Sequence, residues 1–310
     1  MIQHRNLILA FVILFAMVGT ILTLKVIYSV NLNFQPSSGI YDTPTLKVSP
    51  SFFDSGKAGK GSTLVPATPP RNPSDVTARA YLVGDVRTGR IYIESNAEAA
   101  LPVASMSKLV TAFVATDELS PTTIIRITPE EMNVASDTSR ISAGESFTLP
   151  ELLYPLLLNS SNVAAEALAS STNRTKFLEL MSSYAWEIGM PMTFFADPSG
   201  LNPQNQASAR DLFALARYLY KFRPDILSLT RNIRVEAATT SYHGAHEFLS
   251  THPFVSDPRF VGGKTGRTPE AGETMLTILN INGTPVAFIV LGSVSREGDT
   301  RKLIAKVVPN

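Results

Sequence analysis

The chain has 310 residues, of which 44% are hydrophobic and 17% are charged, a composition that fits a globular protein and excludes a disordered one. The formal net charge is +1, so the charge does not favour nucleic acid or another strongly charged partner. There is no cysteine, which excludes a disulfide framework, thiol catalysis and cysteine-ligated zinc.

The first predicted element is an apolar segment, residues 7–24, which lacks charge and lies between Arg5 and Lys25. At a rise of about 1.5 Å per residue, a helix of this length nearly spans a hydrocarbon core of about 30 Å. Because no small-x-small cleavage site follows it, we expect residues 1–28 to be an uncleaved signal anchor rather than a cleaved signal peptide. We therefore expect a single transmembrane helix in the cell membrane, with the rest of the chain on its outer, extracytoplasmic side.

Residues 29–77 form the next segment and are rich in proline, serine, threonine and glycine. They include Gly-Lys-Ala-Gly-Lys-Gly at 56–61 and Pro-Ala-Thr-Pro-Pro-Arg-Asn-Pro at 66–73. A segment of this composition cannot bury a hydrophobic core, so it predicts a tether. The folded domain is then expected over residues 78–310.

Within that domain the pattern is strands, helices, strands. Short β-type runs at 80–83 and 90–93 open it, and runs at 274–280 and 285–291 close it, with the hairpin signal Asn282-Gly283 between the last two. Helical patterns lie between them, at 106–119, from Pro150, at 162–170 and at 209–222, and one more follows at 296–308. At the helix that begins at Pro150, Thr148 and Glu151 have the spacing of a capping box. This order predicts an α+β fold, in which the terminal strands share one antiparallel sheet packed against a helical lobe. A cleft between the two layers is the expected place for chemistry.

The first candidate motif is Ser105-Met-Ser-Lys108, at the start of the helix expected over 106–119. Residues three apart share a helix face, so the Lys108 amine can reach the Ser105 hydroxyl. A serine is a weak nucleophile until a base takes its proton, and a lysine with a lowered pKa can do so. By itself the pattern also arises by chance in many helices.

Two further motifs follow along the chain. Ser160-Ser-Asn162 lies between two apolar helices, where serine and asparagine are also ordinary capping residues. Lys264-Thr265-Gly266-Arg267 precedes the final hairpin, so it is expected on an edge strand that can pair with an extended peptide. The alternative for this third motif is an exposed turn with a solvated lysine.

Taken together, the three motifs match the set Ser-x-x-Lys, Ser-Asp-Asn and Lys-Thr-Gly of class A β-lactamases and penicillin-binding proteins, with serine in place of the aspartate. The resemblance narrows to one family among these proteins because of residues 81–105 and 195–212, which include Asp197-Pro-Ser-Gly-Leu201. Over about residues 78–308 the chain resembles the low-molecular-mass penicillin-binding proteins that are D-alanyl-D-alanine carboxypeptidases of the S11 peptidase family.

The resemblance implies a β-lactamase/transpeptidase-like fold and hydrolysis of the terminal D-Ala-D-Ala bond of peptidoglycan stem peptides. It also implies β-lactams as inhibitors and no metal or organic cofactor. The implied catalytic residues are the nucleophile Ser105, the base Lys108 and the proton relay Ser160. The implied substrate-binding residues are Asn162, Lys264, Thr265, Gly266 and Arg267, where the backbone N–H groups of Ser105 and Arg267 form the oxyanion hole.

The chain also departs from its relatives at several positions, which leaves the preferred substrate open. Val163 stands where they often have aspartate, Ser107 where threonine is common and His252 where asparagine is frequent. Arg267 is a bulky charged residue beside the oxyanion position.

Other functions share some of these features. A class A β-lactamase uses a Glu-x-x-Leu-Asn pattern, and the nearest segment here, 199–202, has no glutamate at the required place. An endopeptidase or transpeptidase shares the acyl-enzyme, and a non-catalytic wall-binding scaffold shares the fold. A zinc site at His243, His246 and His252 is a further alternative, although hydrogen-bonding histidines are more common.

Overall fold

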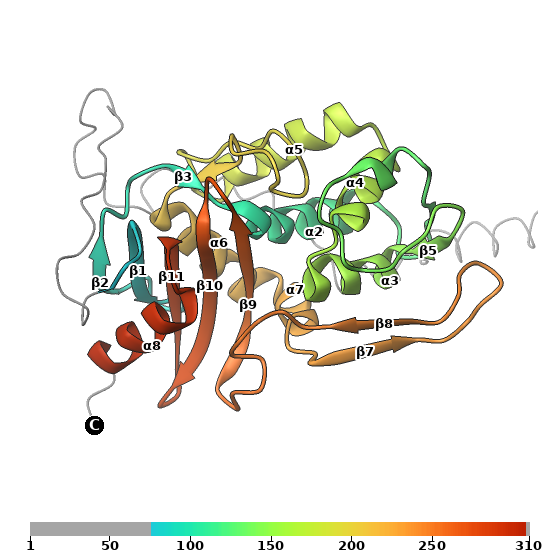
Figure 1. Ribbon diagram of the computed structural model, residues 1–310. Helices are drawn as coiled ribbons and strands as arrows, with labels where there is room; N and C mark the ends of the chain where they lie inside the picture. Colours follow the sequence, from blue (N-terminus) through green and yellow to red (C-terminus); the bar gives the residue numbers. More distant parts are fainter. Residues whose placement is uncertain (1–75, 308–310) are drawn as a thin grey trace, which may run out of the picture. The chain divides into compact units, whose positions relative to one another are not determined.

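The computed structural model describes residues 76–307 (Figure 1). The predicted signal anchor and nearly all of the predicted tether lie outside these residues, so both stay predictions. Within residues 76–307, no helix is long and apolar enough to cross a membrane.

A five-stranded antiparallel sheet forms one layer of the domain, in the order β2-β1-β11-β10-β9. Its strands are β1 (Ala80–Asp85), β2 (Ile91–Ser95), β9 (Phe260–Thr268), β10 (Gly272–Ile281) and β11 (Thr284–Ser293). Because β1 pairs with β11, the two ends of the domain meet in one sheet. This confirms the predicted α+β architecture and places β9 at an edge.

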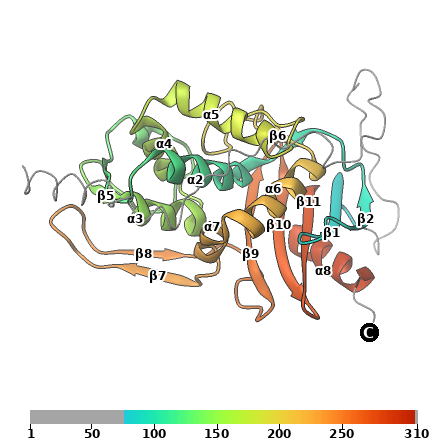
Figure 2. The same ribbon diagram turned by 180° about the vertical axis from the view of Figure 1, so that it is seen from behind.

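The turn Asn282-Gly283 connects β10 to β11. Both residues have positive φ, 51° and 83°, as the predicted hairpin turn requires. The sheet is covered on both faces, by α6 (Ala209–Phe222) on one and α8 (Arg296–Val307) on the other (Figures 1 and 2). Alternate residues of β11 therefore pack into two hydrophobic clusters, one shared with the helical lobe and one with α8: Ala287, Ile289 and Leu291 in the first, and Val286, Phe288 and Val290 in the second.

The helical lobe surrounds α2 (Ser107–Glu118), whose residues from Ser107 to Ala115 are all buried. Around it lie α3 (Leu149–Tyr154), α4 (Asn162–Ser170), α5 (Arg174–Glu187) and α7 (Pro224–Leu229), together with the short turns η2 (Ala104–Met106) and η3 (Glu131–Asn133). The predicted capping box of α3 is present: Thr148 accepts a hydrogen bond from the Glu151 N–H, and Glu151 accepts one from the Thr148 N–H.

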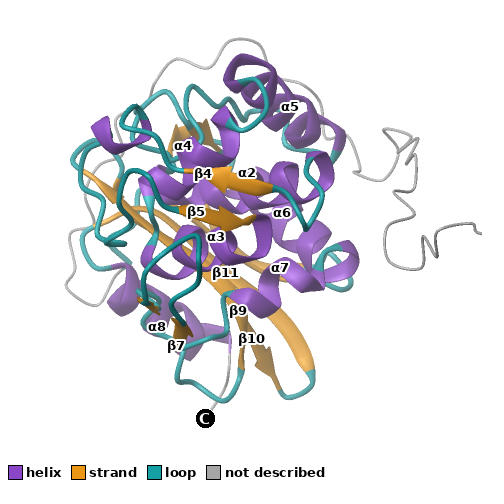
Figure 3. Ribbon diagram, turned by 90° about the vertical axis from the view of Figure 1, so that its right-hand side faces the viewer, coloured by secondary structure: helices purple, strands orange, loops and turns teal. Residues whose placement is uncertain are grey.

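Three small sheets complete the domain: β3 (Leu101–Pro102) with β6 (Gln206–Ala207), β4 (Ile124–Arg126) with β5 (Ser146–Thr148), and β7 (Arg234–Ala237) with β8 (His246–Leu249). Figure 3 shows β4 and β5 lying beside α3 and α4. These short strands were not predicted, because two to four residues give too little periodicity to separate a strand from a loop.

Candidate active site

The three motifs come from three separate parts of the fold. Ser105 lies in η2 and Lys108 in the first turn of α2. Ser160 lies between the π-helical turn η4 (Pro155–Asn159) and α4, which begins at Asn162. Residues 264–267 lie on the edge strand β9, which contacts η2 (Figure 1). The motifs therefore meet where the helical lobe adjoins the edge of the sheet.

The side chain of Lys108 is at the centre of the site and is fully buried. Its Nζ lies 2.9 Å from Ser105 Oγ, 2.7 Å from Asn162 Oδ1 and 2.6 Å from the carbonyl oxygen of Ser199. Burial disfavours the charged form and lowers the pKa of Lys108 to about 7, against the opposing effect of nearby carboxylates, of which Asp197 is the strongest. Near neutral pH, Lys108 is therefore available in its neutral form.

A neutral amine has two N–H groups and one lone pair. At Lys108, Asn162 Oδ1 and the Ser199 carbonyl can accept the two N–H groups, since both are acceptors at hydrogen-bonding distance. The lone pair is then left for the third neighbour, and the Ser105 hydroxyl can donate to it across the 2.9 Å separation. The arrangement fits a general base that is ready to take the Ser105 proton.

Lys264 supplies the second buried amine of the site, and this amine contacts Ser160. Its Nζ donates hydrogen bonds to Ser160 Oγ and to the Thr265 carbonyl, each at 2.9 Å. Burial lowers the pKa of Lys264 well below its ordinary value, and the basic side chains of Lys108 and Arg296 lower it further. Ser160 has a left-handed backbone with φ of 62°, an unusual conformation for a residue other than glycine that is often kept at functional sites.

The remaining predicted residues lie along β9. Thr265 Oγ1 is 3.2 Å from Thr251 Oγ1. At Gly266 the strand passes so close to η2 that an added Cβ would lie 2.9 Å from the Ser105 nitrogen, so glycine is required there. The side chain of Arg267 is exposed. The Arg296 guanidinium donates a hydrogen bond to the Gly266 carbonyl at 2.9 Å and supports this end of the strand.

The segment 197–201 has a role that sequence reasoning missed. It is the tight turn that its composition suggests, because the Asp197 carboxylate accepts hydrogen bonds from the N–H groups of Ser199 and Gly200. The same turn aims the Ser199 carbonyl at Lys108. The motif was recognised by resemblance alone, and nothing in its side chains signals a backbone contact of this kind.

His243, His246 and His252 each have polar partners within the described domain. Within residues 76–307, no group of three or more His, Asp or Glu side chains is arranged to hold a metal ion. His246 pairs with Glu145 at 2.9 Å, while His252 contacts the Leu276 carbonyl at 3.2 Å. Burial lowers the pKa of His252 to about 3, so its ring is neutral.

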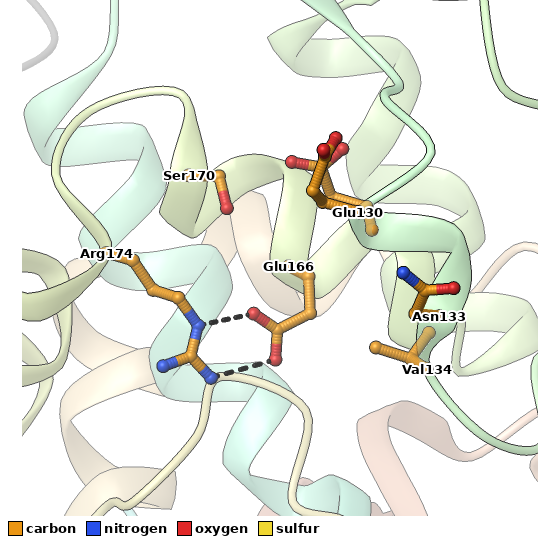
Figure 4. Close-up of a pocket in the computed structure, with 7 residues that line it drawn as sticks. Glu130, Asn133, Val134, Glu166, Ser170 and Arg174 are labelled. Carbon is orange, nitrogen blue, oxygen red and sulfur yellow. Dashed lines mark hydrogen bonds and ion pairs between the residues drawn. The ribbon is translucent and has the colours of Figure 1, made fainter.

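A separate pocket lies beside α4 and is lined mainly by charged side chains (Figure 4). Two of them, Glu166 and Arg174, form a bidentate ion pair with distances of 2.7 and 3.1 Å. The full lining is Glu130, Glu131, Asn133, Val134, Glu166, Ser170 and Arg174. None of the motif residues lines this pocket, so the candidate chemistry lies elsewhere.

Comparison with known proteins agrees with this geometry. The peptidase S11 family, described as D-alanyl-D-alanine carboxypeptidase, matches residues 66–295. Proteins named D-alanyl-D-alanine endopeptidase are 28% identical in Pseudomonas aeruginosa (74% of this chain, 77% of the relative) and 32% identical in Haemophilus influenzae (66% and 72%). Penicillin-binding protein D2 of Listeria monocytogenes, solved with cefotaxime bound, superposes with a TM-score of 0.66 at 29% identity, covering 76% of this chain and 98% of that one. The chain belongs to the peptidase S11 family.

Proposed function

We propose that this protein is a serine DD-peptidase that hydrolyses the terminal D-Ala-D-Ala bond of peptidoglycan stem peptides through an acyl-enzyme, as a carboxypeptidase. One observation carries the proposal: the buried Lys108 amine, with its pKa lowered to about 7, lies 2.9 Å from the Ser105 hydroxyl. A nucleophile in contact with a base that is partly neutral at physiological pH is the essential arrangement of a serine acyl-enzyme.

The first step is attack by Ser105 Oγ on the carbonyl carbon between the two D-alanines, as its proton passes to Lys108 Nζ. The backbone N–H groups of Ser105 and Arg267 stabilise the oxyanion, and each such donor contributes roughly 3–4 kcal/mol. Ser160 Oγ, which contacts Lys264 Nζ, relays to the departing amine the proton that Lys108 took from Ser105. Water then hydrolyses the ester and frees Ser105.

The substrate is held along the open edge of β9, where an extended peptide can add to the sheet. The terminal carboxylate of the peptide is attracted by Lys264 and accepts a hydrogen bond from Thr265, while Asn162 orients the acyl part. β-Lactams acylate the same serine and so act as inhibitors. No step of this mechanism calls for a metal or an organic cofactor.

A DD-endopeptidase is the second candidate, favoured by the names of the relatives from Pseudomonas aeruginosa and Haemophilus influenzae. It uses the same acyl-enzyme and differs in the leaving group, which is a cross-linked peptide instead of free D-alanine. A non-catalytic scaffold or a β-lactamase is less favoured, because the basic groups and hydroxyls of all three motifs are in contact and the β-lactamase glutamate is missing.

The proposal is tested by incubating the purified full-length protein with benzylpenicillin and recording its intact mass. We expect one covalent adduct on the wild type and none on Ser105→Ala, because Ser105 supplies the hydroxyl that lies 2.9 Å from Lys108 Nζ. Ser107→Ala is the control and should keep the adduct, since the Ser107 hydroxyl bonds to the Ala104 carbonyl and the Asn205 amide and not to Lys108. No adduct on folded wild type would favour the scaffold alternative.

The two peptidase activities are separated by offering a stem pentapeptide and a cross-linked muropeptide dimer to the same preparation. Release of free D-alanine from the pentapeptide supports the carboxypeptidase. Conversion of the dimer to monomers, with the pentapeptide left intact, supports the endopeptidase and contradicts the main proposal.

We also propose that residues 7–24 anchor the protein in the cell membrane and that the domain works on its outer side, where peptidoglycan lies. The apolar length of this segment and its charged flanks support the proposal. Protease added to spheroplasts is expected to remove the domain from the wild-type protein, with a cytoplasmic protein as the protected control. A domain that stays protected until the membrane is dissolved would contradict this orientation.

A further inference from the structure

The loop at residues 134–139, between η3 and β5, is hydrogen-bonded to the second motif, Ser160-Ser-Asn162. One oxygen of the Asp137 carboxylate, Oδ1, accepts hydrogen bonds from the Ser161 hydroxyl at 2.7 Å, the Asn162 N–H at 2.6 Å and the Val163 N–H at 3.1 Å. The other oxygen accepts a bond from the Ser139 N–H at 3.0 Å. Asp137 therefore caps the N-terminus of α4, the helix that carries Asn162, from a distant part of the chain.

The same loop determines how the Asn162 amide is turned. Asn162 Nδ2 donates a hydrogen bond to the Ala135 carbonyl at 2.8 Å, and Asn162 Oδ1 accepts one from Lys108 at 2.7 Å. A flipped amide would set its N–H groups against the N–H groups of Lys108 and its oxygen against the Ala135 carbonyl. Both contacts would then be repulsive. The loop thus leaves Asn162 Oδ1 as the acceptor for Lys108.

The loop holds this shape against its own backbone preference. Ser136 and Arg140, which flank the anchored residues, have left-handed φ angles of 58° and 59°. Such angles cost on the order of 1 kcal/mol or more for residues other than glycine, and they persist when surrounding contacts over-determine them. The hydrogen bonds of Asp137 supply those contacts.

We propose that Asp137 is a positioning residue, which holds the Asn162 amide oxygen against Lys108 and thereby prepares Lys108 to take the Ser105 proton. The inference rests on the proposed function, in which Lys108 is the base. Asp137 touches neither Ser105 nor the substrate-binding edge of β9 among its hydrogen bonds, so it acts through Asn162.

The charge of Asp137 affects the pKa of Lys108, and this effect can be measured separately from any loosening of the fold. Burial lowers the pKa of Lys108, whereas three carboxylates raise it: Asp197 from the 197–201 turn, Asp137 from the loop, and Glu166 from α4. The Lys264 amine faces Lys108 from β9, and burial together with Lys108 lowers the pKa of Lys264 well below its ordinary value. Removing the Asp137 charge should therefore move the titration of Lys108 to lower pH. Simple loosening of the fold would lower the acylation rate by one factor at every pH.

The test compares Asp137→Asn, Asp137→Ala and the control Asp85→Asn in the full-length protein. The control is matched, because Asp85 also accepts hydrogen bonds from two backbone N–H groups and a hydroxyl, those of Arg87 and Thr88. Two quantities are measured against pH: the rate constant of acylation by benzylpenicillin, and the ¹³Cε chemical shift of Lys108, assigned by its loss in Lys108→Met.

We expect Asp137→Ala to acylate about tenfold to a hundredfold more slowly, as small misplacements of reacting groups do. Asp137→Asn should show a titration of Lys108 and an acid limb of acylation that are both shifted to lower pH. Asp85→Asn should leave both unchanged. If Asp137→Ala does not fold, Asp137→Asn decides the matter, because asparagine caps helices as well as aspartate does.

The inference is overturned if Asp137→Asn keeps the wild-type acylation profile and the wild-type Lys108 titration, or if its rate falls by a constant factor at every pH. The two readouts also separate the inference from the proposed function. A folded wild type that is never acylated contradicts the proposed function, while a shifted Lys108 titration in Asp137→Asn would still support the positioning role.

Discussion

Replacing Lys108 with methionine is expected to reduce acylation by benzylpenicillin by roughly a hundredfold to ten-thousandfold, which is the usual contribution of a general base. Methionine keeps the length and the apolar stem of the buried side chain but has no proton acceptor of comparable strength. The measurement is the rate constant of acylation, with the melting temperature as a check on folding. Lys176→Met, at an exposed position of α5, is the control and should acylate normally. Unchanged acylation in Lys108→Met would remove Lys108 from the role of base.

The pH dependence supplies a second test of the same residue. Because the pKa of Lys108 is lowered to about 7, wild-type acylation should rise as the pH increases through about 7, where the amine loses its proton. Stability should respond as well. Between about 7 and the ordinary value of 10.5, the unfolded chain binds a proton that the folded chain does not. The stability of the wild type relative to Lys108→Met should therefore increase with pH across this window.

Replacing Gly200 with alanine is expected to lower the free energy of unfolding by more than about 3 kcal/mol, from overpacking and backbone strain together, and to impair acylation with it. Gly200 has a φ of +85°, and an added Cβ would lie 1.9 Å from the Ala104 carbonyl oxygen and 2.9 Å from the Ser105 nitrogen. Backbone atoms cannot move aside as a flexible side chain can, so η2 or the 197–201 turn must shift. Either movement displaces Ser105 relative to Lys108.

The control for this variant is Gly144→Ala. Gly144 also has a positive φ, +93°, but an added Cβ there would meet nothing within 4 Å. In Gly144→Ala the loss in free energy of unfolding should be limited to backbone strain, about 1–2 kcal/mol, and acylation should be normal. Chemical denaturation gives the free energies, and equal losses for the two variants would show that the contact between Gly200 and Ala104 is not tight.

Much of the fold follows from local sequence signals. The Asn282-Gly283 turn, the capping box at Thr148 and the order of strands and helices act over a few neighbouring residues, and the structure confirms all three. The three motifs likewise identified side chains that the fold brings into contact. These predictions succeed because turn geometry, helix capping and helix periodicity depend on residue type at short range.

What only the tertiary structure decided is the surroundings of those side chains. The Ser199 carbonyl lies 91 residues from Lys108 and the Ala135 carbonyl 27 residues from Asn162, and a backbone carbonyl is the same in every residue. In the sequence, Asp137 is one polar residue among others in a loop. The tertiary structure shows that its carboxylate lies at the N-terminus of α4. The lowered pKa of Lys108 depends on complete burial, because removing an amine from water disfavours its charged form. Residue identity therefore indicated which side chains the fold brings together, while long-range packing set their orientation and charge.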